Sequence, residues 1–554
     1  MANIAALLSR QLETPERVLY RQFTDGAWRD FTAREIAELA AAWQAAFRRE
    51  RFAAGDRVAI GLRNGIQWVA LDLAALGAGL VVVPLYAYDN PANQAYCVAT
   101  SGARLAVVET GRMAAELERA GVPGSSLLCA RPEEANPGRA VQSFLPTPDR
   151  PFGAVPIGSA ALATICFTSG TAGRPKGVML SHGNILANVE DCLATNMARP
   201  DDVFLSLLPL SHMFERTGGY YLPLWIGAKV AYARGVAQLP EDLESQRPTA
   251  MFAVPRVFEK LAGRIRAAVA DSPLKRGLLE RCAASGFRVE QGAATIGDRM
   301  LTPLLRQLVA RPILARLGGR MRIAVLGGAA MDPEISRLFI GLGLPVVQGY
   351  GLTEASPVVA VNRLGDNDPE TVGRPLPNVQ ISLSEAGELL AKGPNVMLGY
   401  WNDPDATARV LDRDGWLRTG DLAELRDGRI AIHGRLKDIL VLSNGEKLPP
   451  QDVELAILAD DTFDQILLVG EGRPFLTLLA VAKTADEKEL VRRANERLKA
   501  FPRYIRVRRA IASPEAWTVE NGLATPTMKV KRNEVLKRFA PEIEAAYASG
   551  ATTG

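Results

Sequence analysis

A loop of small, polar and basic residues between two apolar segments is the first feature that could do chemistry. It reads TSGTAGRPKG over 168–177, after the apolar run LATICF and before a helical stripe of Ile185, Val189 and Leu193. Glycine tolerates positive φ and lacks a Cβ, so the backbone N–H groups of such a loop can approach phosphate oxygens. We predict a phosphate-binding loop. Its residues are Thr168, Ser169, Gly170, Thr171, Ala172, Gly173 and Lys176.

The spacing in this loop excludes the P-loop of kinases and NTPases. That motif needs glycine directly before its lysine and serine or threonine directly after it. Here Pro175 precedes Lys176 and Gly177 follows. An ordinary Gly-rich turn remains the structural alternative, but the hydroxyl residues and the mobile cation favour phosphate binding.

Short β-branched segments alternate with helical patterns on either side of the loop. The segments cover 57–62, 80–86, 105–110, 229–233, 251–255, 321–328 and 345–351. Continuous apolar strands separated by helices indicate mostly parallel sheets buried on both faces. We therefore predict an α/β fold, with a large N-terminal domain of layered, mostly parallel sheets and helices over residues 1–434.

The pattern changes after about residue 434. Two short strands with turn residues lead into a helical segment, two further apolar strands and a helix over 486–499 that carries Leu490, Ala494 and Leu498 on one face. This pattern predicts a small α+β domain over 435–554, with the boundary at 435–438.

Composition excludes several classes of protein. The chain has 554 residues, 48% of them hydrophobic, and a net charge of +4 without a long basic run, so nucleic acid is not an expected partner. Its five cysteines are scattered and include no CxxC pair, which argues against disulfides and thiolate metal sites. The N-terminus lacks a signal-peptide core, and no stretch approaches the roughly 20 apolar residues of a membrane span. We expect a cytoplasmic protein.

Five motifs, taken together, resemble the adenylate-forming superfamily of acyl-CoA synthetases, luciferases and peptide-synthetase adenylation domains. TSGTAGRPKG resembles the family's signature loop, and the other motifs follow in the family's order, so the resemblance covers nearly the whole chain. They are YGLTE (350–354), GWLRTGD (415–421), GRLKD (434–438) and PTMKVKR (526–532). Three further segments look like long-chain fatty acid–CoA ligases. These are LPLSHMFERTGGYY (208–221), VPRVFEK (254–260) and SNGEKLPP (443–450).

The resemblance implies ATP-dependent conversion of a fatty acid to acyl-AMP, followed by thioester formation with coenzyme A. Carboxylate and triphosphate are both anions, and two unit charges about 4 Å apart repel by about 4 kcal/mol at an effective dielectric near 20. Cations must therefore supply most of the catalysis. The resemblance places Lys529 beside the reacting groups and makes Thr171 and Glu354 the Mg²⁺ ligands. The implied catalytic residues are Lys529, Lys176, Thr171, Glu354 and His212.

Other residues receive nucleotide roles from the resemblance. Tyr350 would stack on adenine, Asp421 and Arg435 would bind the ribose, and Lys437 would mark the hinge about which the small domain rotates between the two steps. Without the family context, Lys529 would pass for a solvated lysine, Asp421 for a turn residue and His433 for a structural histidine. The remaining nucleotide-site residues implied are Gly328, Ala329, Ala330, Gln348, Gly349, Gly351 and Thr353.

Several alternatives stay open. The acid could be aryl or medium-chain, the acceptor could be a carrier protein, and a nucleotide-binding relic is a non-enzymatic alternative that the intact charged residues oppose. Ala172 stands where the family usually has threonine, so one phosphate contact is missing, but activity should survive. The expected partners are small molecules. A monomer or homodimer and a loose contact with the inner face of the membrane are both compatible with the sequence.

Overall fold

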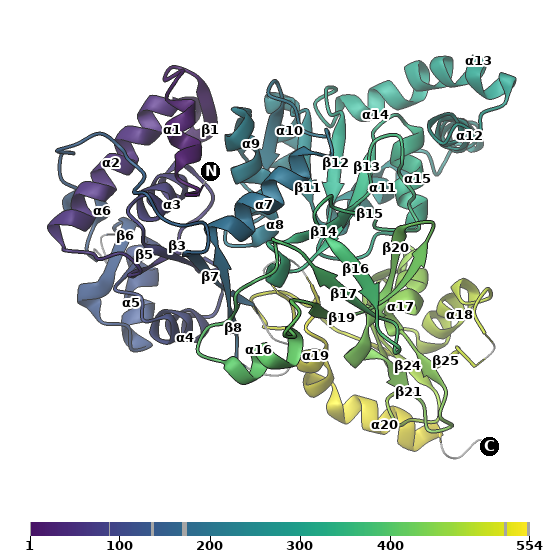
Figure 1. The fold of residues 1–554 in the computed structure, drawn as a ribbon. Coiled ribbons are helices and arrows are strands. Elements are labelled where there is room, and N and C mark those ends of the chain that lie inside the picture. The colour runs from purple at the N-terminus through teal and green to yellow at the C-terminus, as the bar shows by residue number, and fades with distance from the viewer. Residues whose placement is uncertain are drawn as a thin grey trace.

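Two large sheets make up most of the N-terminal part of the molecule, and smaller sheets follow toward the C-terminus (Figure 1). The computed structural model describes residues 2–87, 89–133, 138–168, 174–502, 504–525 and 529–550. None of the described helices is long and apolar enough to span a membrane.

The larger sheet has nine strands in the order β15-β14-β13-β12-β11-β9-β10-β1-β2. The six strands from β13 to β1 are parallel, and antiparallel strands close both edges. The strands are β1 Val18–Thr24, β2 Ala27–Thr32, β9 Val203–Ser206, β10 Lys229–Tyr232, β11 Ala250–Ala253, β12 Ile323–Leu326, β13 Val346–Gly351, β14 Val358–Val361 and β15 Arg374–Pro375.

The second sheet has seven strands in the order β18-β8-β7-β4-β3-β5-β6, and the five from β7 to β6 are parallel. The predicted fold of layered, mostly parallel sheets is confirmed. The strands are β3 Arg57–Gly61, β4 Val81–Pro84, β5 Leu105–Thr110, β6 Leu127–Arg131, β7 Leu162–Thr168, β8 Lys176–Ser181 and β18 Gly399–Tyr400.

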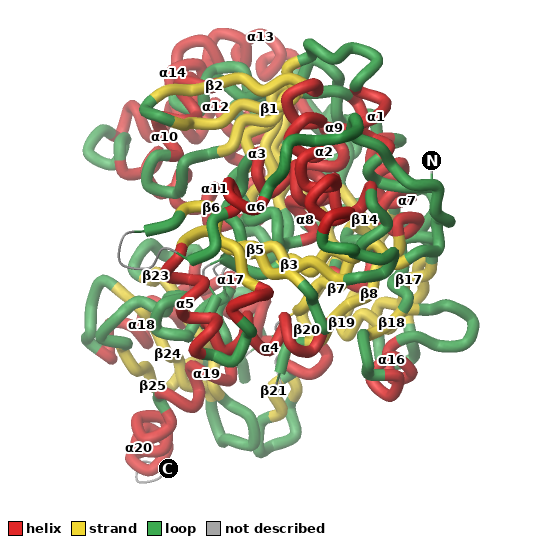
Figure 2. Tube along the Cα trace, turned by 90° about the vertical axis from the view of Figure 1, so that its left-hand side faces the viewer, coloured by secondary structure: helices red, strands yellow, loops and turns green. Residues whose placement is uncertain are grey.

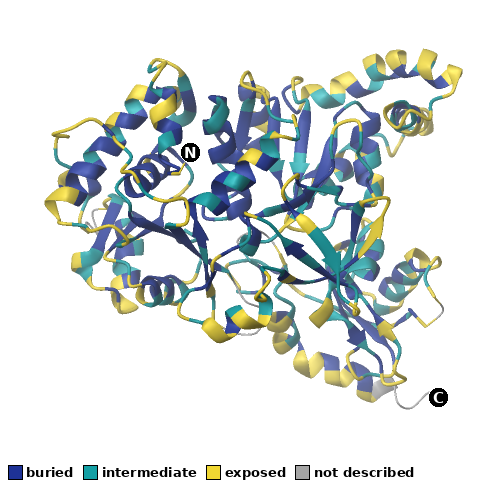
Figure 3. Cartoon of the chain, viewed as in Figure 1, coloured by how far each residue is buried: buried dark blue, intermediate teal, exposed yellow. Residues whose placement is uncertain are grey.

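Helices cover both sheets and leave them in the dark interior of Figure 3. α3 is made mostly of apolar residues and is almost wholly buried, as expected of a helix packed between other layers. Ser181 caps the N-terminus of α7, and its hydroxyl accepts a 3.0 Å hydrogen bond from the Asn184 N–H. The main helices are α1 Ala6–Gln11, α2 Ala33–Arg49, α3 Ile66–Gly77, α4 Pro91–Ser101, α5 Gly111–Arg119, α7 His182–Leu193, α10 Leu239–Gln246, α11 Pro255–Ala267, α12 Pro273–Glu290, α13 Ile296–Leu305, α14 Arg311–Ala315, α15 Pro333–Gly341 and α16 Pro404–Val410.

A buried ion pair fixes the segment 208–221 to the core. Arg216 and Asp72 are both fully buried and bonded to each other, and Asp72 also accepts hydrogen bonds from the hydroxyls of Tyr220 (3.1 Å) and Tyr221 (2.9 Å). Leaving any of these groups unpaired would be costly. The network therefore fixes the place of the segment that carries His212.

A four-stranded antiparallel sheet in the order β16-β17-β19-β20 leads into the C-terminal part. Beyond it lie two small sheets with an apolar core of their own, built from residues such as Leu448, Leu468, Leu478 and Leu490. These elements are β16 Gln380–Leu383, β17 Glu388–Lys392, β19 Leu417–Arg426, β20 Arg429–Arg435, β21 Leu440–Val441, β22 Lys447–Leu448, α17 Pro450–Leu458, β23 Phe463–Val469, β24 Leu476–Ala482, α18 Glu487–Arg497, β25 Val507–Ala512, α19 Arg532–Arg538 and α20 Ala540–Gly550.

Both views of the chain place the helices α13 and α20 far from each other. α13 and α20 lie at opposite ends of the molecule in Figure 1 and again in Figure 2, which is turned by 90°. α13 and its neighbour α12 extend outward from the end of the nine-stranded sheet.

Candidate active site

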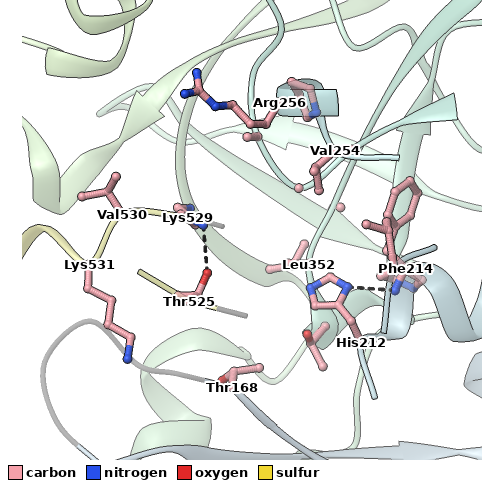
Figure 4. Close-up of a pocket in the computed structure, with 18 of the residues that line it drawn as sticks. Thr168, His212, Phe214, Val254, Arg256, Leu352, Thr525, Lys529, Val530 and Lys531 are labelled. Carbon is pink, nitrogen blue, oxygen red and sulfur yellow. Dashed lines mark hydrogen bonds between the residues drawn. The ribbon is translucent and has the colours of Figure 1, made fainter. Parts of the chain in front are cut away.

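A cavity of about 2460 Å³ lies between the N-terminal and C-terminal parts, and both contribute to its wall. From the first part come residues that follow the carboxyl ends of parallel strands, which is where α/β folds usually bind ligands. From the second part comes the segment around Lys529. Figure 4 shows Thr168, His212, Leu352 and Lys529 gathered around this space.

Most of the predicted site residues line this one cavity. Ser169, Gly170, Thr171, Ala172 and Gly173 lie outside the described residues. The predicted residues on the cavity wall are Thr168, Lys176, His212, Gly328, Ala329, Ala330, Gly349, Tyr350, Gly351, Thr353, Glu354, Arg435, Lys437 and Lys529.

The two described ends of the phosphate loop lie opposite each other. Thr168 ends β7 and pairs with Lys176, which begins β8, in an antiparallel ladder. The Lys176 ammonium lies 5.0 Å from the ring centroid of Tyr400, a cation–π distance. The Tyr400 hydroxyl in turn donates a 2.8 Å hydrogen bond to Glu354 Oε1. Lys176 and Glu354 are therefore linked through an aromatic residue that the sequence analysis missed, because nothing in the spacing connects residue 400 with residue 176.

The carboxylate of Asp421 has two partners, Tyr350 at the end of β13 and Arg435 on β20. Asp421 on β19 stands opposite Arg435 on β20 in the strand register, and Arg435 Nε lies 3.0 Å from Asp421 Oδ1. The Tyr350 hydroxyl donates a 2.6 Å hydrogen bond to Asp421 Oδ2. Burial and the Asp421 charge raise the pKa of Tyr350, so its hydroxyl stays protonated as a donor. Asp421 itself is buried, and it reaches the cavity wall through its contacts with Tyr350 and Arg435, which line it.

The buried side chain of Gln348 supports the turn that follows β12. Gly328 has φ +81°, a conformation that favours glycine. Gln348 is buried, donates a 2.8 Å hydrogen bond to the Pro369 carbonyl and accepts a 3.3 Å bond from the Met331 N–H. Gln348 is therefore placed to support the turn at 328–330 and does not itself line the cavity.

His212 lies at the start of α8 (Met213–Glu215), on the cavity wall. Its Nδ1 accepts a 3.3 Å hydrogen bond from the Phe214 N–H, drawn as a dashed line in Figure 4. Burial lowers its pKa to about 4, so the ring is neutral near pH 7 and carries its proton on Nε2. His212 can therefore offer a neutral N–H donor to a ligand.

Lys529 is set among charges from both parts of the chain. Its N–H donates a 3.0 Å hydrogen bond to the Thr525 hydroxyl, which fixes the backbone at this point (Figure 4). Lys529 is exposed and is one of the residues that line the cavity. Desolvation lowers the pKa of Lys529. The positive charges of Arg435 and Lys437 lower this pKa further, whereas the carboxylates of Asp421 and Asp438 raise it. Two further cations near Lys529 indicate a place prepared for an anion.

One arm of the cavity is apolar. Its lining comes from the segment that follows α7, from the helix α9 (Leu222–Ile226) and from the strands β9, β11, β12 and β14. Phe252 stacks on Phe204 with ring centroids 6.2 Å apart. The side chains are Met197, Ala198, Phe204, Leu222, Met251, Phe252, Val325, Val358 and Val361. This arm can hold an extended hydrocarbon chain while its charged group stays with the cations.

Two family models account for most of the chain. Residues 8–401 match the model described as AMP-binding enzyme, and residues 437–551 match the AMP-binding enzyme C-terminal domain. The chain belongs to the AMP-binding enzyme family. Members of this family use ATP and coenzyme A as substrates, and the superfamily predicted from the five motifs is confirmed.

Curated relatives assign this AMP-binding enzyme to the long-chain subgroup. Long-chain-fatty-acid–CoA ligase FadD15 of Mycobacterium bovis is 29% identical over 98% of this chain and 97% of its own length. Long-chain-fatty-acid–CoA ligase 6 of Mus musculus is 31% identical over 88% of this chain and 78% of its own. The predicted subgroup is therefore confirmed.

Solved structures share the fold of this AMP-binding enzyme. ATP-bound MatB from Rhodopseudomonas palustris superposes with a TM-score of 0.75 at 21% identity, covering 97% of this chain and 99% of that one. A benzoate CoA ligase from Burkholderia xenovorans LB400 gives the same TM-score and identity, with 97% and 100% coverage.

The donor set around Glu354 suits a hard divalent cation. Glu354 engages Tyr400 through Oε1 only, which leaves Oε2 without a hydrogen bond to any described residue. No three His, Cys, Asp or Glu side chains cluster as a metal centre in the part of the chain that the structure describes. A Mg²⁺ ion that takes most of its ligands from phosphates and water fits one carboxylate of this kind.

Proposed function

We propose that this protein activates a long-chain fatty acid as acyl-AMP, with release of pyrophosphate, and then transfers the acyl group to coenzyme A. The observation that supports the proposal most directly is that one cavity contains both a positively charged region and an apolar region. A polar region with Lys176, Arg435 and Lys529 meets an apolar arm that is lined by strands of the nine-stranded sheet. The names of the curated relatives support the same activity.

Charge neutralisation is the main task of the polar region. We assign Lys529 to the fatty carboxylate and the α-phosphate, and Lys176 to the outer phosphates. Glu354 and Thr171 would hold Mg²⁺, which supplies positive charge against the phosphates. Fixed cations that need no reorganisation lower the barrier to bringing two anions together.

The nucleoside would bind on the opposite side of the same region. In the proposal Tyr350 stacks on adenine, beside the turn at 328–330, and Asp421 accepts hydrogen bonds from the ribose hydroxyls. Each carboxylate oxygen offers about two lone-pair sites, so Asp421 can keep Tyr350 and Arg435 while it binds a diol.

Thioester formation would use a second arrangement of the two parts. We propose a hinge at 435–438 between a domain over 1–434 and one over 435–554. Support comes from the chain path, because β20 ends at Arg435 and the short turn Leu436–Asp438 follows directly. Rotation there would withdraw Lys529 and admit the thiol of coenzyme A.

The apolar arm would set the preference for the acid. Burying each methylene contributes about 0.8 kcal/mol, so an extended chain binds far more tightly than a short one. An aryl acid would leave much of the arm unfilled.

A panel of acids tests the proposal. Saturated acids of increasing length and benzoate are incubated with ATP, Mg²⁺ and coenzyme A, and AMP and acyl-CoA are measured separately. We expect kcat/KM to rise with chain length and AMP and acyl-CoA to form in equal amounts. Preference for benzoate or a short acid would contradict the substrate class. AMP formation without acyl-CoA would point to a carrier protein as acceptor.

A further inference from the structure

The helical hairpin of α12, α13 and α14, residues 273–315, carries an unusual surface. It extends from the end of the nine-stranded sheet in Figure 1, away from the cavity between the two parts. Its attachment is close, because a Cβ at Gly286 on α12 would lie 1.9 Å from the Gly341 carbonyl oxygen of α15. The two backbones touch there, so the hairpin is rigidly mounted on the body.

The outward face of α13 is apolar. Ile296 is 81% exposed, Met300 77% and Leu304 53%, and Leu308, in the helical segment Arg306–Ala310 that continues α13, is 65% exposed. Their spacing of four places them along one side of this continuous helical stretch. In Figure 3 exposed residues recur along this helix, between buried ones, at the edge of the molecule. A stripe of this kind is the reverse of the usual pattern, in which the apolar face of a surface helix points inward.

Polar contacts on the inner face hold α13 in this orientation. Asp298 is buried, forms an ion pair with Arg288 on α12 and accepts a 2.8 Å hydrogen bond from the Thr295 hydroxyl. Thr302 and Ser285 share a 2.6 Å hydroxyl–hydroxyl hydrogen bond. Turning the stripe inward would break these buried contacts, so the apolar face stays outside.

Exposed apolar side chains concentrate in this hairpin. Thirteen large hydrophobic residues are exposed in the part of the chain that the structure describes, and six of them lie between Leu274 and Leu308. Single exposed leucines are ordinary, but a concentration marks an interaction surface. The six are Leu274, Leu278, Ile296, Met300, Leu304 and Leu308.

The charge around the stripe selects its partner. Residues 273–315 contain seven basic and three acidic side chains, and two of the acids are taken up by ion pairs inside the hairpin. Five exposed cations form no ion pair with any described residue. A second copy of the hairpin would bring these like charges together across a two-fold axis, whereas an anionic bilayer complements them. The five are Lys275, Arg276, Arg281, Arg299 and Arg311.

We propose that the hairpin docks this protein on an anionic lipid bilayer. The stripe from Ile296 to Leu308 enters the boundary between headgroups and acyl chains, and the surrounding cations contact lipid phosphates. The hairpin is inserted between β11 and β12, neighbouring strands that line the apolar arm. If the proposed function holds, docking brings the acyl-binding strands to the compartment in which long fatty acids dissolve.

Vesicle co-sedimentation of the full chain tests the proposal. The probe is a vesicle of phosphatidylglycerol and phosphatidylcholine, compared with pure phosphatidylcholine at low and high salt. The variant Met300→Gln/Leu304→Gln/Leu308→Gln replaces three of the four stripe residues with a good helix former at exposed positions. We expect it to lower partitioning by about tenfold or more, and Arg299→Gln/Arg311→Gln to lower the preference for the anionic lipid by about tenfold or more.

A matched control carries Val236→Gln/Leu364→Gln, at exposed apolar positions outside the hairpin. It should bind vesicles as the unaltered chain does, and melting curves should show that all variants fold. Equal binding of the stripe variant and the control would overturn the proposal. So would a lipid-free dimer that the stripe variant converts to a monomer, because the stripe would then cover a second copy. No step needs turnover, so failure here leaves the proposed reaction untouched.

Discussion

The Tyr350 hydroxyl and the Asp421 carboxylate are joined by a 2.6 Å hydrogen bond across two different sheets. Tyr350 comes from the end of β13, and Asp421 from the middle of β19. Arg435 holds the other carboxylate oxygen from the neighbouring strand. The residues proposed to contact adenine and ribose are therefore directly hydrogen-bonded to each other, and we expect a substitution of one to alter the position of the other.

Substitution of Asp421 should weaken ATP binding more than substitution of Tyr350. Asp421→Asn removes the charge and half of the acceptor capacity, and hydrogen bonds to charged groups are worth about 1.5–3 kcal/mol, or roughly a 10- to 150-fold rise in Kd. Tyr350→Phe keeps the stacking ring and loses one hydrogen bond, so we expect a rise of about fivefold. Isothermal titration with ATP measures both effects. Equal effects would show that Asp421 acts only through Tyr350.

Sequence patterns were sufficient for the sheets but not for this cross-sheet contact. Apolar runs predicted the parallel strands, because burial on both faces requires them. The register that sets Asp421 opposite Arg435 depends on the β19–β20 hairpin and its bulge between Leu422 and Ala423. A one-residue slip would turn Asp421 to the other face, so the contact depends on geometry that no spacing rule contains.

Adenylation should lose activity at a lower pH than a normal lysine would allow. Desolvation and two neighbouring cations lower the pKa of Lys529, so it loses its charge as pH rises through a value below the usual 10.4 or so. The rate of pyrophosphate release should fall along that limb. In Lys529→Arg the limb should move to higher pH, because guanidinium remains charged.

Lys529→Ala separates the two chemical steps. It should slow adenylation by about a hundredfold or more yet leave thioester formation from added acyl-AMP largely unchanged. Lys537→Ala, a mainly exposed lysine on α19 that also lines the cavity, serves as the matched control. Equal loss of both steps in Lys529→Ala would contradict the proposed withdrawal of this residue between them.

His433 should stabilise the fold more at low pH than at high pH. Its Nε2 lies 3.4 Å from Glu424 on β19, and its Nδ1 lies 3.5 Å from Asp452 on α17. The Asp452 hydrogen bond is the main cause of its raised pKa, which Glu424 also raises, while desolvation and Arg426 oppose it. The folded state therefore binds the proton more tightly, and this stabilisation is full below the unfolded pKa near 6.5 and lost as pH rises through the folded value.

The matched variant is His433→Gln. Urea unfolding should show a loss of less than about 1 kcal/mol at about pH 5.5, because the pair is partly exposed, and no loss at about pH 9. A larger deficit at high pH than at low pH would contradict the assignment. The sequence predicts that His433 is a structural residue. Its contacts with Glu424 on β19 and Asp452 on α17 explain how it would stabilise the fold.

Exposure was the least predictable property of the chain. The segment 273–315 contains Leu278, Leu279, Leu304, Leu305 and Leu308 at spacings that fit several helix faces, and only the packing on α15 decides which face is inside. The contacts of Tyr400 with Lys176 and Glu354 could not be predicted from the sequence either, because they depend on the pairing between β18 and β8.

Gly218 should limit how the apolar arm accepts the fatty chain. A Cβ at this position would lie 2.6 Å from the Phe252 ring, and both residues line the cavity. Gly218→Leu should therefore push the ring into the arm and displace methylenes. At about 0.8 kcal/mol each, every displaced methylene lowers kcat/KM for long acids by about fourfold, while short acids are little affected. Gly263→Leu, a helical position with no neighbour within 4 Å, is the matched control.

Removal of the displaced ring decides between a blocked arm and a damaged fold. In Gly218→Leu/Phe252→Ala the space taken by the new leucine is returned, so the rate with long acids should recover relative to Gly218→Leu. Melting temperatures of the single and double variants report on folding separately. If the double variant stays as slow with long acids as Gly218→Leu while melting normally, the arm beside Phe252 does not hold the acyl chain.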